Sequence, residues 1–326
     1  MMVNTSPAMN TIKSSVDVIT SAYNEEECIG ELFRRLNLVF NQELDYIFRI
    51  IIVDNGSTDS TWEIISSACK NDPKIHGYRM SRNFSLDAAF TCGIDNASAD
   101  IAIIMTSDLQ DPPEVIHKFL REFEKGYDQV LGKVINRKSV PFIRRILSSA
   151  FYKIASSLTD GMLPRSVSDF RLVNKKTYLA MRTLRESHRF LRGLGAWVGF
   201  KTVEIEIERP QRYAGKSKWL GIPLLKTVTT AGKSILAYSA TPLIWVSFTG
   251  LFFSIFSAIV LVLLACFWIF SGVPFAGYGS IFAAISLSFS LTMLGIGIVA
   301  QYVGLIYDEV KQRPLYLISE RTSNLV

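Results

Sequence analysis

The sequence contains one long segment without any charged or histidine side chain, which extends over residues 234–307. A helix that crosses the hydrocarbon core of a bilayer needs about 20 apolar residues, so the segment has room for two crossings. We place them near residues 243–270 and 281–306, joined by a tight turn over residues 271–280. Two helices buried in a soluble core are the alternative, but the segment is far longer than such helices need. The sequence therefore predicts a transmembrane hairpin over residues 242–307.

Basic residues flank the predicted hairpin, whereas the turn between its helices carries no charge. Lys226 and Lys233 precede the hairpin, and Lys311, Arg313 and Arg321 follow it. Because lysine and arginine are enriched in cytoplasmic loops, both ends of the hairpin are expected to face the cytoplasm. The protein is thus predicted to be a multi-pass protein of the inner (plasma) membrane, with its large N-terminal domain and both termini in the cytoplasm.

The part of the chain before the hairpin has the pattern of an α/β domain. Apolar runs such as VDVITSAY, FRIIIVD and DIAIIMTSD alternate with amphipathic stretches. This alternation predicts a mainly parallel sheet with crossover helices over residues 15–215. A flexible tail is expected over residues 1–14, amphipathic helices on the membrane surface over 216–241, and a cytoplasmic tail over 308–326. Helices of the domain are expected at residues 25–40, 60–70, 84–96 and 113–125.

The cysteines and the charge exclude several classes of protein. Cys28, Cys69, Cys92 and Cys266 show no CxxC spacing, which argues against a zinc site and a disulfide framework. The net charge of +6 is modest and fits an anionic membrane surface or a phosphate ligand. Aromatic and basic residues are not interleaved in the way typical of nucleic-acid binding, so no nucleic-acid partner is expected.

Two acidic residues follow a predicted strand in the stretch IAIIMTSDLQDPPE, residues 101–114. In open α/β sheets, ligands bind outside the carboxyl ends of the strands. Asp108 and Asp111 are therefore expected where a divalent cation and its diphosphate ligand bind. A solvated turn followed by a helix cap, with Asp111 before Pro112 and Pro113, is the alternative interpretation.

Three strand ends are expected to meet at this site. Tyr23 and Glu25 follow the first strand, Asp54 ends the second, and Asp108 follows the fourth. Asp54 is placed to accept hydrogen bonds from a base or a ribose. No GxGxxG or GxxxxGK[ST] motif occurs, so a metal ion is expected to hold the phosphates instead of a glycine-rich loop.

Several motifs resemble a known enzyme family, and they occur in the order SAYNEEECIGEL, IIIVDNGSTDST, YRMSRNFSLDAAFTCGID, TSDLQDPPE, VSDFRL, HRFLRGLGAWVGF and RYAGKSKW. They are similar to family 2 glycosyltransferases that load a sugar onto a polyprenyl phosphate. Dolichyl-phosphate mannose synthases and bacterial undecaprenyl-phosphate glucosyltransferases of the GtrB type are of this kind. The resemblance, over about residues 16–305, implies an α/β, Rossmann-like catalytic domain of the GT-A fold followed by the two-helix hairpin.

The resemblance also implies roles for single residues. Asp108 and Gln110 match two ligands of the family's metal-binding acidic motif, which implies Mg²⁺ or Mn²⁺ as cofactor. Relatives usually have Asp at the position of Thr106, so the first metal carboxylate is missing. The hydroxyl of Thr106, or Asp111, is the expected substitute. The positions assigned to nucleotide binding are Tyr23, Glu25, Asp54 and Arg82.

Asp169, in the motif VSDFRL, matches the acid to which the family's catalytic role is usually assigned. A lipid phosphate is already anionic at neutral pH, so it needs little help from a general base. We therefore expect Asp169 to position the sugar or the phosphate, with base action as a lesser role. An acid paired for structural reasons, with Arg171 as its partner, is the alternative.

Basic residues are expected to hold the acceptor phosphate. Arg144 and Ser148 lie four residues apart, hence on one face of a helix, and Arg137 precedes them. Arg212 and Lys216 fall where the chain meets the membrane, which suits a lipid headgroup or the donor diphosphate.

These residues predict a metal-dependent inverting hexosyltransferase that uses a nucleotide-diphosphate sugar, with UDP-glucose as first choice. The acceptor is expected to be undecaprenyl phosphate or a similar polyprenyl phosphate at the cytoplasmic membrane face. The alternatives are a mannosyl or amino-sugar transferase with GDP-mannose or another donor, and a non-catalytic membrane scaffold that retains the fold. A processive polysaccharide synthase is disfavoured because Q-x-x-R-W is absent. Small residues in SLTMLGIGIVA suit helix packing in a homo-oligomer.

Overall fold

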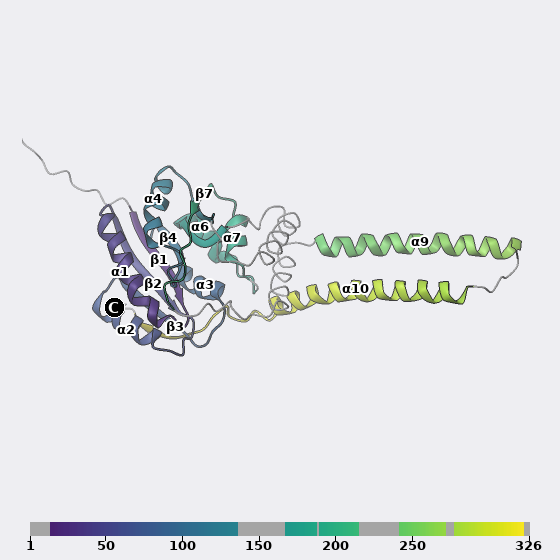
Figure 1. Ribbon diagram of the computed structural model, residues 1–326, viewed down its shortest axis with the longest axis horizontal. Coiled ribbons are helices and arrows are strands. Elements are labelled where there is room, and N and C mark those ends of the chain that lie inside the picture. The colour runs from purple at the N-terminus through teal and green to yellow at the C-terminus, as the bar shows by residue number, and fades with distance from the viewer. Residues whose placement is uncertain (1–13, 136–166, 188, 215–240, 272–276, 323–326) are drawn as a thin grey trace, which may run out of the picture. The chain divides into compact units, whose positions relative to one another are not determined.

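The structure is a computed structural model that describes residues 14–135, 167–187, 189–214, 241–271 and 277–322. It forms two compact units (Figure 1). The described part of the first comprises residues 14–135, 167–187, 189–214 and 314–322, and that of the second residues 241–271 and 277–313. The predicted sites at Arg137, Arg144, Ser148 and Lys216 lie outside the described residues, as do the predicted tail up to residue 13 and surface helices over residues 216–240.

The first unit is built around a sheet in which eight strands are described, in the order β7, β5, β6, β4, β1, β2, β3, β8. Parallel pairing joins β1 to β2 and β4, β2 to β3, and β5 to β7. Strands β6 and β8 run antiparallel to their neighbours. The mainly parallel sheet is thus confirmed. The strands are β1 Ser14–Ala22, β2 Tyr46–Asp54, β3 Ile75–Met80, β4 Ile101–Thr106, β5 Gln129–Val134, β6 Val167–Asn174, β7 Thr202–Ile207 and β8 Ile318–Thr322.

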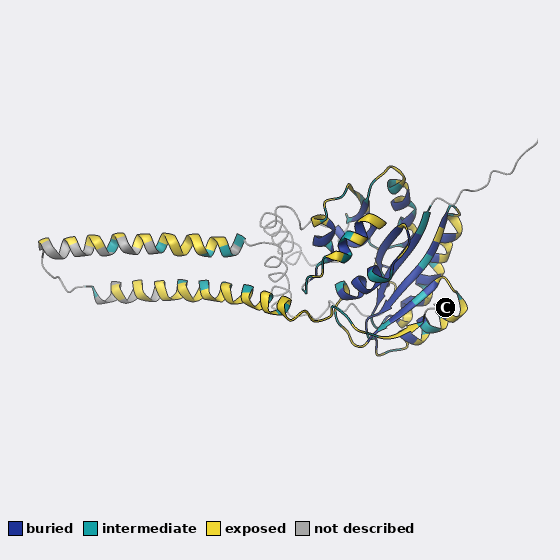
Figure 2. Ribbon diagram, turned by 180° about the vertical axis from the view of Figure 1, so that it is seen from behind, coloured by how far each residue is buried: buried dark blue, intermediate teal, exposed yellow. Residues whose placement is uncertain are grey.

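Helices cover both faces of this sheet, and the buried strands lie between them (Figure 2). Alternate residues of β1 enter two different hydrophobic clusters, with Val16 and Val18 in one and Ile19 in the other. Burial on both faces is the normal situation of a parallel strand. One cluster includes residues of α1, α2 and α4, and the other residues of α3, α6 and α7. These helices are α1 Glu26–Gln42, α2 Thr61–Asn71, α3 Leu86–Asn96, α4 Ile116–Glu124, α6 Lys175–Thr183 and α7 Leu191–Trp197.

The predicted helices begin and end within three residues of those observed, because their apolar periodicity is clear. The predicted apolar face of α1, Ile29, Leu32, Phe33 and Leu36, is buried. Helix α3 begins later than predicted, since Ser85 caps it by accepting a hydrogen bond from the Ala88 N–H at 3.0 Å. A 3₁₀ turn, η1 Pro113–Val115, replaces the first turn of the helix expected at residues 113–125.

Strand β8 was not predicted, and it lies in the segment that we expected to be only a tail. It pairs antiparallel with β3, with Thr322 opposite Gly77 and Glu320 opposite Arg79. The pairing is close, because a Cβ on Gly77 would lie 2.5 Å from Thr322 Oγ1. The sequence ISERT is short and polar, so it lacks the apolar alternation by which strands are found. At the other end, Ser14 belongs to β1 and not to the predicted tail.

The second unit consists of two long apolar helices, α9 Thr241–Ser271 and α10 Tyr278–Val310, which lie side by side (Figure 1). Most of their described apolar side chains are exposed, as a lipid environment requires. Within the described residues, the segment Leu287–Val310 is long and apolar enough to cross a membrane, which supports membrane association. The helix α10 starts at Tyr278, inside the predicted turn. Two crossings with both ends in the cytoplasm remain a prediction.

Candidate active site

The site lies at the carboxyl ends of the central strands of the first unit. Ala22 at the end of β1 is opposite Asp54 of β2, and Ser21 is opposite Thr106 of β4. The hydroxyl of Ser107 donates a hydrogen bond to the Ser21 carbonyl at 2.8 Å and fixes the chain as it leaves β4. The predicted convergence of the three strand ends is therefore confirmed.

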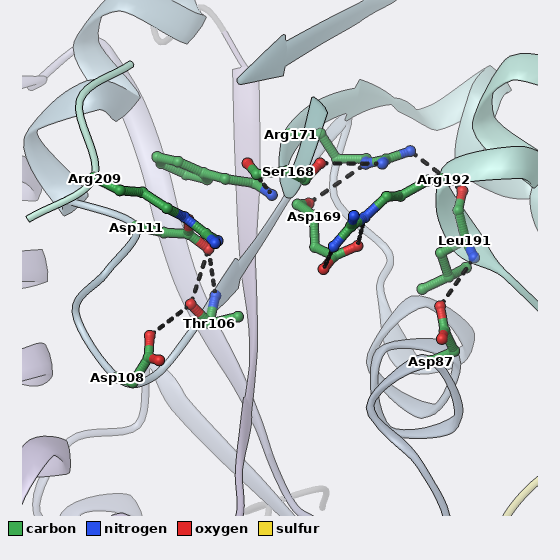
Figure 3. A network of polar contacts seen from close by, with 11 residues as sticks. Asp87, Thr106, Asp108, Asp111, Ser168, Asp169, Arg171, Leu191, Arg192 and Arg209 are labelled. Atoms are coloured by element: carbon green, nitrogen blue, oxygen red, sulfur yellow. Dashed lines mark hydrogen bonds and ion pairs between the residues drawn. The ribbon is translucent and has the colours of Figure 1, made fainter. Parts of the chain in front are cut away.

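The acidic loop after β4 is held together by its own side chains (Figure 3). Oδ1 of Asp108 accepts hydrogen bonds from Thr106 Oγ1 at 2.8 Å and from the Gln110 N–H at 3.2 Å. Leu109, between Asp108 and Gln110, is buried. Its backbone adopts a left-handed conformation with φ of 61°, which is unfavourable for a bulky side chain and typical of functional loops. The described residues form no hydrogen bond to Asp108 Oδ2, so this oxygen is available to a ligand.

Asp111, in contrast, is fully buried and held by other residues of the protein. Its Oδ1 accepts from Nε and Nη2 of Arg209, at 3.0 and 2.6 Å, and its Oδ2 accepts from the Thr106 N–H at 3.1 Å and lies 2.9 Å from the Thr106 hydroxyl oxygen. Burial raises the pKa of the Asp111 carboxyl above its ordinary value, against the opposing effect of Arg209. Asp111 thus supports the loop, and the geometry does not favour it as the substitute metal ligand.

The side chains of the acidic loop offer few ligands to a divalent cation. Thr106 has one hydroxyl proton but lies within hydrogen-bonding distance of both Asp108 and Asp111, so it cannot donate to both at once. At any moment one of the two carboxylates therefore lacks this hydrogen bond. The described residues contain no group of three or more His, Cys, Asp or Glu side chains suited to a metal. An ion held by Asp108 Oδ2 would therefore take most of its ligands from water and phosphates, as Mg²⁺ does, and Gln110 as a further ligand remains a prediction.

Asp169 on β6 is paired with Arg192 of α7 (Figure 3). The two form a bidentate ion pair, with Nε–Oδ1 and Nη2–Oδ2 distances of 2.7 and 2.6 Å. Burial opposes ionisation of Asp169, but the positive charge of Arg192, with smaller effects from Arg171 and Arg209, outweighs it and holds the pKa below its ordinary value. The carboxylate is therefore charged at neutral pH and is a weak base.

The side-chain partner of Asp169 is Arg192 and not Arg171, the partner expected if Asp169 were paired only for structural reasons. Arg171 is fully buried, and its guanidinium donates to the main-chain carbonyls of Leu191 at 3.2 Å and of Ser168 and Asp169 at 3.4 Å. Asp87, in the first turn of α3, accepts a hydrogen bond from the Leu191 N–H at 3.0 Å. Arg171 and Asp87 thus hold both sides of the residue that precedes Arg192.

Asp87 provides a stability test of this arrangement. Burial, followed by the nearby charge of Asp169, raises the pKa of Asp87 to about 6. Because a carboxyl with a raised pKa in the folded state stabilises most when protonated, its contribution is lost as the pH rises from about 4 through about 6. We expect Asp87→Asn to raise the free energy of unfolding by about 1 to 3 kcal/mol at pH 7 but by little at pH 4. Thermal unfolding of both purified proteins at the two pH values measures this, and an equal change at both would contradict it.

Of the residues predicted to bind the nucleotide, Asp54 and Glu25 are buried and Tyr23 is half-buried. Asp54 is fully buried; its Oδ1 accepts from the Ser57 N–H at 3.0 Å, and burial raises its pKa. Glu25, also buried, forms an ion pair with Arg212, so a predicted nucleotide residue and a predicted phosphate residue are in direct contact. Tyr23 is half-buried on the same loop.

Arg82 is exposed, and its main chain packs against the loop after β2. Its guanidinium stacks on the Phe84 ring, 4.1 Å from the centroid. Gly56, in the loop after Asp54, has a φ of 75°, and a Cβ there would lie 2.5 Å from the Arg82 carbonyl carbon. The loop after β2 therefore packs on the Arg82 backbone, which requires glycine at this position.

Sequence reasoning did not single out Asp87, Arg192 or Arg209. Arg192 lies inside the motif HRFLRG and Asp87 inside SLDAAF, and both motifs were used only to support the family resemblance. Arg209 follows the alternating strand TVEIEI, where a single basic residue gives no signal of its own. Arg192 reaches the site from α7, Arg209 from the segment after β7, and Asp87 lies beside it in α3.

Comparisons with known proteins identify the family of the chain. The family described as Glycosyl transferase family 2 matches residues 17–181. The chain is 32% identical to the "Uncharacterized glycosyltransferase YkcC" of Bacillus subtilis, over 93% of each chain. It is 31% identical to the "Bactoprenol glucosyl transferase" of Shigella phage SfII, over 94% of this chain and 97% of that protein.

Solved structures are less similar. A glucosyl-3-phosphoglycerate synthase from Mycobacterium tuberculosis, in complex with Mn²⁺, UDP and glucosyl-3-phosphoglycerate, shares 17% identity with a TM-score of 0.46. The match covers 70% of this chain and 79% of that chain, and a likeness of this size carries no argument about ligands. The sequence matches and the mainly parallel sheet confirm the predicted GT-A fold class. With a family match over half of the chain and relatives above 30% identity over nearly all of it, the chain belongs to glycosyltransferase family 2.

Proposed function

We propose that the protein transfers glucose from UDP-glucose to undecaprenyl phosphate, or a similar polyprenyl phosphate, with inversion at the anomeric carbon. The similarity to bactoprenol glucosyl transferases over nearly the whole chain supports the type of reaction and acceptor. We further propose that the reaction takes place at the cytoplasmic face of the membrane, in a multi-pass protein whose two termini lie in the cytoplasm, and that the apolar helices also support a homo-oligomer.

The observation that carries the proposal is the shared location of the acidic loop and Asp169. Strands β4 and β6 are neighbours, with Ile104 opposite Arg171. The residues that follow Ile104 in β4 and those that precede Arg171 in the antiparallel β6 therefore lie at the same end of the sheet. Figure 3 shows Asp108 and Asp169 in this common region, with Arg209 and Arg192 beside them. Two carboxylate sites flanked by guanidinium groups suit a reaction between two anionic substrates.

In this proposal Asp108 and Gln110 hold a divalent cation, Mg²⁺ or Mn²⁺, which when bound stabilises charge on the departing nucleoside diphosphate. Tyr23, Glu25, Asp54 and Arg82 bind the nucleotide. Arg212, which Glu25 fixes by an ion pair, is near the same substrate.

Asp169 acts by position and not as a base. Its carboxylate is fixed by two hydrogen bonds from Arg192 and is kept ionised, so it can accept a hydrogen bond from a sugar hydroxyl and orient the donor. The acceptor phosphate oxygen needs no deprotonation before it attacks the anomeric carbon. We place the lipid phosphate with Arg137, Arg144, Ser148 and Lys216, which lie outside the described residues.

Replacing Asp108 by Asn tests the role of the acidic loop. The change removes the charge of the cation ligand but preserves the shape and the contact with Thr106, so we expect Mn²⁺ to bind about 10- to 100-fold more weakly. Titration of the purified protein with Mn²⁺ in the presence of UDP, followed by electron paramagnetic resonance, measures this binding. Sugar transfer to undecaprenyl phosphate, with a panel of nucleotide sugars, is expected to fall in parallel.

Asp72→Asn is the matched control, because Asp72 lies just before β3, at the opposite ends of the strands. It is expected to leave Mn²⁺ binding and transfer unchanged. Full activity of the wild type in the presence of a chelator would contradict the metal role of Asp108. Absence of transfer with every nucleotide sugar, together with unchanged behaviour of the Asp108 variant, would favour the scaffold alternative.

A further inference from the structure

Strand β8 places Glu320 between two side chains of the first unit. Arg79 lies opposite Glu320 in the β3–β8 pairing, and its Nη1 donates to Glu320 Oε1 at 2.9 Å. The other carboxylate oxygen, Oε2, accepts from Trp62 Nε1 of α2 at 3.1 Å. The guanidinium carbon of Arg79 also lies 5.7 Å from the centroid of the Trp62 ring. Glu320 thus fixes one end of the Arg79 guanidinium against α2.

The other nitrogens of Arg79 face the loop after β2. Its Nε lies 3.4 Å from Asp54 Oδ2, and its Nη2 donates to the Ser57 carbonyl at 3.4 Å. Asp54 Oδ2 is buried and has no hydrogen-bond partner within the described part of the chain. A buried carboxylate oxygen without a hydrogen bond is unfavourable, and in native proteins it usually indicates a ligand or a functional role.

The segment that contains Glu320 is anchored along its length. The Ser81 N–H donates to the Leu317 carbonyl at 2.9 Å, and the Tyr316 hydroxyl donates to Asp95 Oδ2 at 2.8 Å. Arg185 also pairs with Asp95, at 2.8 Å. These contacts hold the segment on β3 and α3 independently of Glu320, so a change at Glu320 alone should leave β8 in place.

We propose that Glu320 is a positioning residue for the nucleotide end of the donor site, and this inference rests on the proposed function. Glu320 attracts one end of the Arg79 guanidinium and keeps it from forming a full ion pair with Asp54. Asp54 Oδ2 therefore receives no hydrogen bond from the described part of the chain and is left as the acceptor for a base N–H or a ribose hydroxyl. Without the charge on Glu320, Arg79 closes onto Asp54 and occupies this acceptor.

The test is Glu320→Gln in the full-length protein, because glutamine keeps the size and polar contacts but not the charge. We expect the Kd for UDP and the KM for UDP-glucose to rise about tenfold, while kcat changes less than twofold. Glu206→Gln is the matched control, since Glu206 is an exposed strand residue on β7, at the other edge of the sheet. Equal Kd and KM in the wild type and the Glu320 variant would overturn the inference.

A double-mutant cycle distinguishes this role from a loss of structure. In an Asp54→Asn background, Glu320→Gln is expected to leave the Kd for UDP unchanged, because the acceptor that it protects is gone. Additive effects of the two substitutions, or a fall in kcat as large as the rise in KM, would overturn the inference. If the wild type itself binds no UDP but binds another nucleotide, the donor assignment fails, and the same cycle is measured with that nucleotide. If it binds none, the proposed function fails.

Discussion

Asp169→Ala is expected to lower kcat for sugar transfer by a factor on the order of 10² to 10³. The substitution removes a carboxylate that is held in one orientation and leaves Arg192 beside the site without its bidentate partner. The nucleotide residues lie on other strands, so the Kd for UDP should change much less than kcat. Steady-state rates with saturating Mg²⁺ and undecaprenyl phosphate, together with UDP binding, separate the two effects.

Asp169→Asn tests whether the charge of Asp169 is needed for transfer. The low pKa of Asp169 means that the wild-type residue stays ionised as the pH falls from 8 to about 5, so its protonation should cause no loss of kcat in that range. A fall in kcat within that range would therefore indicate the titration of a group other than Asp169. Asp72→Asn again serves as the control, and a fully active Asp169→Asn protein would show that the charge is not needed.

The second large effect concerns stability. Arg209→Met removes the partner of Asp111, whose carboxylate is completely buried. Breaking a buried ion pair by removing one partner costs about 3 to 5 kcal/mol, and since Arg209 is partly exposed we expect a value near the lower limit. Thermal or denaturant unfolding of the purified protein measures the loss.

Two further variants identify the cause of that loss. Arg34→Met breaks an exposed pair with Glu31 on α1 and should leave the stability nearly unchanged. Adding Asp111→Asn to Arg209→Met removes the unpaired buried charge and should restore part of the lost stability. If Arg209→Met were as mild as Arg34→Met, the buried pair would not support the acidic loop as we infer.

The sequence revealed those parts of the fold and site that depend on local patterns. The apolar spacing of Ile29, Leu32 and Leu36 predicts α1, and the apolar run before Asp108 predicts β4 and the acidic loop. The partners of the site's acids depend on tertiary contacts. Arg192 is 23 residues from Asp169 and Arg209 is 98 residues from Asp111, and no local pattern relates such pairs.

Thr106 shows how a sequence difference becomes interpretable only with its neighbours in place. In the sequence alone, Thr106 indicates only that the acidic motif lacks its first carboxylate. In the structure its hydroxyl lies between Asp108 and Asp111, at 2.8 and 2.9 Å, so it connects one acid that faces the site to another that is buried. The residue therefore organises the loop, whatever its contribution to cation binding.

The pairing of β3 with β8 also constrains how the chain matures. Ser319 donates a hydrogen bond to the Arg79 carbonyl, 240 residues earlier in the sequence. During synthesis, β3 emerges from the ribosome long before its partner, and both apolar helices are made in the interval. An unpaired strand edge is prone to association with other chains. The nascent domain must therefore either protect this edge or tolerate it until β8 has been made.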